Sequence, residues 1–126
     1  MSPIRTTAAV AAALLLSGCG GQSALQTEAT NLQSLAAEGG LLAGDAARGR
    51  SSTIFMREHT GFLLTAATAS AKTLAQGPRP LARLAAHVVD DLGRLSRSGS
   101  NHAEQRRISV DLTRAAQRVA KLGQNL

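Results

Sequence analysis

Two side chains in the second half of the chain have the spacing at which a helix brings polar groups together. His87 stands four residues before Asp91, so a helix would present imidazole and carboxylate on one face, to one cation or to a proton in transit. Arg83 and Arg94 flank them on the same strip, where they would repel a metal ion and pair with Asp90 and Asp91. We expect a solvated strip of salt bridges rather than a metal site.

The other histidines lack the spacing of a metal centre in a helical bundle. Di-iron sites in bundles need Glu-x-x-His pairs, which place carboxylate and imidazole one turn apart on one face. Here Glu58 adjoins His59, and His102 precedes Glu104 by two residues. We therefore predict no metal and no other cofactor, and we expect His59 to be a hydrogen-bonded core histidine.

A row of basic side chains lies along one flank of the last expected helix, and only Asp111 interrupts it. It consists of Arg107, Arg114, Arg118 and Lys121. Such a flank beside an apolar stripe can lie against an anionic surface, where each charge contributes up to about 1 kcal/mol. The alternative is an ordinary solvated face in which Asp111 pairs with Arg107 and Arg114.

Motifs of catalysis are absent from the sequence. It has no Gly-x-Ser-x-Gly nucleophile turn, no phosphate-binding glycine loop and no convincing pair of acidic residues. Serine and histidine both occur, but not at spacings that indicate a catalytic arrangement. We expect a protein that is not an enzyme.

Helices must position these side chains, because helical periodicity recurs after residue 19 while alternation typical of strands does not. The first helix is expected over about residues 22–48, and the second ends near residue 75 with Ser51, Ser52 or Thr53 as its cap. The expected inner face of the first consists of Leu25, Ala29, Leu32, Ala36, Ala43 and Ala47. That of the second consists of Phe55, His59, Phe62, Ala66, Ala69 and Thr73, with Leu63 alongside.

Two further helices follow the turn Gly77-Pro78-Arg79-Pro80, in which glycine suits a left-handed helix end and proline a helix start. Asn101 and Glu104 form a plausible capping box for the last helix. The apolar stripes are Leu81, Leu84, Ala85, Val88, Leu92 and Leu95, then Ile108, Leu112, Ala115, Val119 and Leu122. Stripes joined by short turns predict an all-α fold, a small antiparallel up-down-up-down four-helix bundle.

Gly39-Gly40 lies inside the first expected helix and leaves two interpretations open. Each glycine costs roughly 1 kcal/mol relative to alanine in a helix interior, which favours a break or kink. Alternatively, the small residues Ala36, Gly40 and Ala43 allow another helix backbone to approach closely.

The N-terminus has the pattern of an export signal: a positive charge at Arg5, then an uninterrupted small and apolar run over residues 8–16. The run is far shorter than the roughly 20 residues that cross a bilayer. Its end, Leu16-Ser17-Gly18-Cys19, resembles the lipobox of bacterial lipoproteins. The resemblance implies a cleaved signal peptide (1–18), diacylglycerol with chains such as palmitate on Cys19, a tether (19–23) and a bundle domain (24–126).

The resemblance also implies an exported location, with the protein anchored through Cys19 to the outer face of the cell membrane. If the source has two membranes, the absence of aspartate after Cys19 favours the outer one. Two or three acyl chains hold a protein far more firmly than one chain does.

Composition narrows the class of partner. The chain has a net charge of +6, with two Phe and no Trp or Tyr, so it lacks the aromatic platforms on which sugars or single-stranded nucleic acid stack. We expect no nucleic acid partner, and instead an envelope protein, anionic lipid or wall polymer.

The leading hypothesis for the function is a non-enzymatic interaction or structural module. The alternative is a carrier for an apolar ligand in the bundle core, motivated by large and small residues mixed on the second helix.

Overall fold

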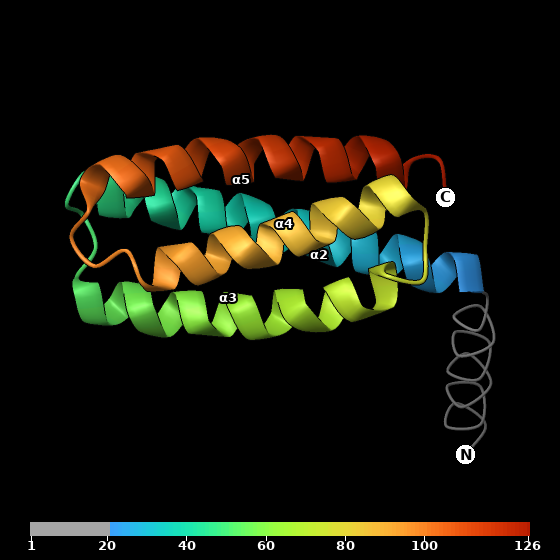
Figure 1. Ribbon diagram of the computed structural model, residues 1–126, viewed down its shortest axis with the longest axis horizontal. Helices are drawn as coiled ribbons and strands as arrows, with labels where there is room; N and C mark the ends of the chain where they lie inside the picture. The colour runs from blue at the N-terminus through green and yellow to red at the C-terminus, as the bar shows by residue number, and fades with distance from the viewer. Residues whose placement is uncertain (1–20) are drawn as a thin grey trace, which may run out of the picture.

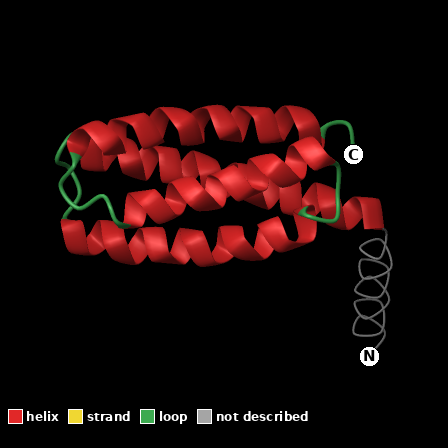
Figure 2. Cartoon of the chain, viewed as in Figure 1, coloured by secondary structure: helices red, strands yellow, loops and turns green. Residues whose placement is uncertain are grey.

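A computed structural model describes residues 21–126 of the chain, with side chains from Ala24 onward. The described residues form helices joined by short loops, and they contain no strand (Figure 2). The four helices are α2 (Gly21–Ala47), α3 (Thr53–Leu74), α4 (Arg79–Ser96) and α5 (His102–Gly123). This confirms the predicted all-α bundle.

Successive helices run in opposite directions, and α2 and α5 pack side by side to close the bundle (Figure 1). Because the helices alternate in direction, one end of the bundle holds the start of α2, the α3–α4 loop and the end of α5. The chain therefore enters and leaves the described domain at the same end.

The helix starts follow the predicted local signals. The Phe55 N–H donates to Ser52 Oγ at 3.1 Å, which caps α3, and the Glu104 N–H donates to Asn101 Oδ1 at 3.1 Å, which caps α5. Only half of the capping box forms, because the Asn101 N–H donates to the Ser98 carbonyl instead.

The left-handed glycines lie elsewhere than predicted. Positive φ angles occur at Gly49 (71°) and Gly99 (54°) and not at Gly77. A Cβ at Gly77 would approach Leu25 Cδ2 to 3.1 Å. This glycine therefore serves the close contact between the α3–α4 loop and α2.

The apolar stripes of α4 and α5 form the core as predicted. Every member is buried except Leu122, which is half-buried. On α2 the predicted face is also confirmed, with Leu25 and Ala47 half-buried at its ends. The fully buried large side chains of the core include Leu32, Met56, Leu63, Leu74, Leu81, Leu92, Leu95, Ile108 and Leu112.

The predicted inner face of α3 is wrong. Phe55 and Phe62 are 54% and 70% exposed, and Ala69 is exposed as well. The buried face lies one residue further along the helix and consists of Met56, Thr60, Leu63, Ala67, Ser70 and Leu74. The carrier hypothesis thus loses the mixed inner face that motivated it, although ligand binding itself stays a prediction.

α2 continues through Gly39-Gly40 without a break, so the close-approach interpretation is the correct one. A Cβ at Gly39 would lie 2.7 Å from Leu92 Cδ2, and one at Gly40 would lie 2.8 Å from Thr113 Oγ1. Ser109 Oγ also donates to the Gly40 carbonyl at 2.8 Å. The packing of α5 against α2 thus offsets the cost of two glycines within a helix.

Replacing Gly40 with leucine should lower the free energy of unfolding by about 1–3 kcal/mol, because the larger side chain forces α2 and α5 apart. The matched control is Gly61→Leu, since a Cβ at Gly61 meets no atom within 4 Å. That variant should be neutral or more stable by up to about 1 kcal/mol through helix propensity. Equal losses in denaturant unfolding of the two variants would contradict the close approach.

The signal peptide (residues 1–18), the lipobox residues and Cys19 lie outside the described residues. α2 begins at Gly21, so it overlaps the tether predicted over residues 19–23 and starts close to the helix start predicted at about residue 22. Among the described helices, none combines the length and hydropathy needed to span a lipid bilayer.

Candidate functional site: the α4–α5 face

Three side chains that can bind a proton or a cation meet between α4 and α5. His87 and Asp91 come from α4, one turn apart as predicted, and Asp111 comes from α5. One ligand atom from each lies within 4.8 Å of the others, and His87 Nε2 is 3.3 Å from Asp91 Oδ2. The structure therefore adds a second carboxylate to the pair that the sequence indicated.

Asp91 is the unusual member of this cluster, because its side chain is only 1% exposed. Among the described residues, no group donates a hydrogen bond to either carboxylate oxygen, although His87 Nε2 lies at ion-pair distance from Oδ2. Burial raises the pKa of Asp91 above its ordinary value, the charge of His87 opposes this rise, and Asp111 adds to it. A buried carboxylate without donors is costly in free energy, so this position favours either a proton or a bound cation.

The expected solvated strip of salt bridges is correct only in part. Arg94 pairs with Asp90 at 3.3 Å on the exposed side of α4. Asp91 is buried and faces His87, and it forms no ion pair with Arg83 or Arg94. The reason is that consecutive side chains point in different directions around a helix: Asp90 points to solvent, whereas Asp91 points toward α5.

A basic groove adjoins this cluster on the same face. Its cavity of about 440 Å³ is lined by Arg79, Pro80, Arg83, Leu84, His87 and Arg118. A second cavity of about 210 Å³ shares Leu84, His87 and Arg118 and adds Asp111, Arg114 and Ala115. His87 thus lines both cavities, of which the first contains no carboxylate and the second contains Asp111 beside two arginines.

The four residues of the predicted basic flank of α5 do not form one continuous surface in the structure. Arg114 and Arg118 line the groove, and Lys121 is exposed further along α5. Arg107 instead pairs with Glu104 at 3.5 Å. The expected pairing of Asp111 with Arg107 and Arg114 is not among the ion pairs of the described residues.

Sequence reasoning missed Arg79 and Arg83 as part of a basic surface. They precede His87 at four-residue intervals, a spacing that puts all three on one side of α4. This four-residue spacing is the feature of the sequence that could have identified them. Their position opposite Arg118 depends on how α4 and α5 align, which the spacing within one helix does not reveal.

The remaining histidines have structural contacts. His59 is 33% exposed rather than in the core, and its Nε2 lies 2.9 Å from Glu38 Oε1 on α2 while its ring stacks on Phe55. His102 Nδ1 lies 3.0 Å from the Ala46 carbonyl oxygen. Because a carbonyl only accepts, Nδ1–H donates there and satisfies a carbonyl at the end of α2.

No protein-family model, curated protein or solved structure matches this chain. The fold and the site define it as a small antiparallel four-helix bundle with a polar, mainly basic face between α4 and α5.

Proposed function

We propose that this protein is a non-enzymatic interaction module of the cell envelope, held by lipid at Cys19, whose α4–α5 face binds phosphate-bearing lipid headgroups or wall polymers. The basic groove carries the proposal. Its first cavity is lined by three arginines and a histidine, and no carboxylate belongs to that lining.

The charges of this groove are available to an external anion. Among the residues that the structure describes, none of Arg79, Arg83, Arg114 and Arg118 has an acidic side chain at ion-pair distance; the arginines that do are Arg48, Arg94 and Arg107. Arginine presents its N–H groups in a planar fork that matches two oxygens of one phosphate. Several such side chains along one groove favour a polyanion or an anionic surface.

The position of the groove agrees with an anchor at Cys19. Arg79 and Arg83 lie near the start of α4, and Arg118 lies near the end of α5. Both of these helix ends are at the end of the bundle where α2 begins, two residues after Cys19 (Figure 1). A lipid on Cys19 would therefore bring the groove close to the headgroups of the same membrane.

Reversing two groove charges should weaken binding to anionic vesicles at least about tenfold, since each cation near such a surface contributes about 1 kcal/mol. The measurement is sedimentation of residues 20–126, which lack the lipid attachment residue, with phosphatidylglycerol vesicles. The variant is Arg83→Glu with Arg118→Glu. Binding should also fall as salt is raised.

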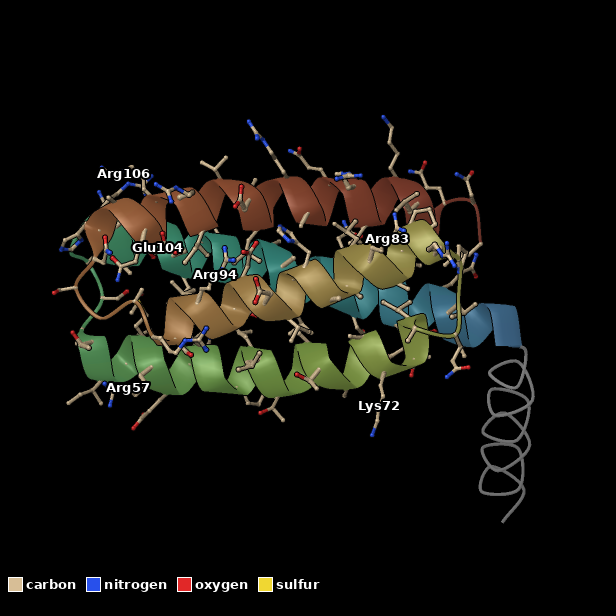
Figure 3. All side chains as sticks on the ribbon, in the orientation of Figure 1. Arg57, Lys72, Arg83, Arg94, Glu104 and Arg106 are labelled. Carbon is tan, nitrogen blue, oxygen red and sulfur yellow. The ribbon has the colours of Figure 1, made fainter. Side chains whose placement is uncertain are left out.

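The matched control is Arg57→Glu with Lys72→Glu, which makes the same change of net charge on α3. Figure 3 shows both side chains on the side of the bundle away from α5, whereas Arg83 lies on α4 beside α5. Equal loss in the two double variants would mean that net charge, and not the groove, determines binding. Repeating the assay with soluble polyphosphate separates a wall polymer from a lipid surface as the natural anion.

A further inference from the structure

The second feature of the α4–α5 face is the cluster of His87, Asp91 and Asp111, whose two carboxylates do not favour an anion. It contains two carboxylates and one imidazole, with ligand atoms within 4.8 Å of one another. The donors come from two helices, α4 and α5, that a short connection over residues 97–101 joins. A cation bound by all of them would link α4 to α5.

We propose that His87, Asp91 and Asp111 form a binding site for a divalent transition metal, with Zn²⁺ as the best fit. The site shares His87 with the proposed anion-binding groove, but its argument does not use anion binding. It rests on the convergence of the donors and on Asp91, whose carboxylate is buried, lacks hydrogen-bond donors and faces His87.

The geometry of the site agrees with Zn²⁺. The 3.3 Å between His87 Nε2 and Asp91 Oδ2 is about the edge of a tetrahedron formed by ligands at roughly 2.0–2.1 Å from Zn²⁺. Asp111, whose carboxylate oxygen lies within 4.8 Å of the other two ligand atoms, would be the third protein ligand, and the adjoining cavity of about 210 Å³, which His87 and Asp111 line, would give a water access to the fourth position. Ca²⁺ fits less well because it takes six to eight oxygen ligands.

The two carboxylates of the cluster do not form ion pairs with the arginines that the structure describes around them. On α4, Arg94 is paired with Asp90. On α5, Arg114 and Arg118 share the cavity wall with Asp111, and neither is at ion-pair distance from it. The two carboxylates match the charge of a divalent ion, and binding would give the buried Asp91 carboxylate a bond to a cation in place of the hydrogen bonds that it lacks.

The test is calorimetric titration of Zn²⁺ into the full chain, purified in mild detergent and treated with a chelator. We expect one equivalent to bind near neutral pH. Asp91→Asn and Asp111→Asn should each weaken binding at least about tenfold, since even the loss of an outer partner of a metal ligand costs ten- to hundredfold. Asp90→Asn is the matched control on the exposed side of α4 and should bind as the native chain does.

Helical circular dichroism of each variant shows whether it folds. His87→Gln keeps the inference testable if the buried Asp91→Asn fails to fold, because the His87 side chain is half exposed. Replacement of Zn²⁺ by Co²⁺ adds an independent readout, since tetrahedral Co²⁺ absorbs visible light and His87→Gln should change that spectrum. Absence of binding, or binding that all three ligand variants leave unchanged, would overturn the site.

Discussion

Replacing Leu63 with alanine should lower the free energy of unfolding by about 2–5 kcal/mol, whereas replacing Phe62 with alanine should alter it by less than about 1 kcal/mol. Leu63 is fully buried between α3 and its neighbours, so its truncation leaves a cavity in the core. Phe62 is 70% exposed, and the better helix propensity of alanine offsets the little area that the ring buries.

Denaturant unfolding, followed by circular dichroism, measures both changes. The two substituted residues are neighbours on one helix but lie on different sides of it, so each variant is the control for the other. If Phe62→Ala were the more destabilising, the core face of α3 would be the one that the sequence predicted.

This pair also shows where sequence reasoning reached its limit. On α4 and α5, leucines and valines alternate with arginines and aspartates at helical spacing, so one face alone can be buried. On α3 apolar residues occur on every side, and the face that is buried includes Thr60 and Ser70. The pattern favoured the side with the phenylalanines, while packing among the helices selected a side with smaller residues.

The continuity of α2 at Gly39-Gly40 also could not be predicted from the local sequence. The propensity of glycine predicts a weak helix there, and both a break and a close contact agree with the sequence. The choice depends on Ser109 and Thr113, which lie about seventy positions away in the chain and contact Gly40 only in the folded bundle. Long-range packing therefore decided a local conformation.

For the candidate site, the sequence revealed the part that lies within one helix. His87 and Asp91 were recognised from their four-residue spacing, and Arg114 and Arg118 from theirs. Asp111 was interpreted as a partner of the arginines on its own helix. Its proximity to Asp91 depends on the alignment of α4 with α5, and so does the burial that makes Asp91 unusual.

Replacing Cys19 with alanine should abolish lipid attachment and leave an unprocessed precursor. In lipoproteins with this motif the thiol is the attachment point, and the peptidase cuts only after the lipid is in place. The bundle should keep its stability, because the described residues build a buried core from side chains between Ala29 and Val119. A cooperative, strongly helical melt is therefore expected for both proteins.

Membrane fractionation with a high-salt wash, followed by intact mass measurement, tests this prediction. The salt wash is needed because the basic α4–α5 groove would otherwise retain some protein on anionic lipid, whereas a covalent anchor of two or three chains resists salt. Ser17→Ala is the matched control, since the lipobox accepts small residues before the cysteine, and this variant should be lipidated and cleaved normally. If Cys19→Ala were cleaved at the normal position and stayed with the membranes after the wash, the lipoprotein interpretation would fail. The bundle would then lose the anchor that brings its basic groove to a membrane, while binding of polyphosphate by that groove would still be open to measurement.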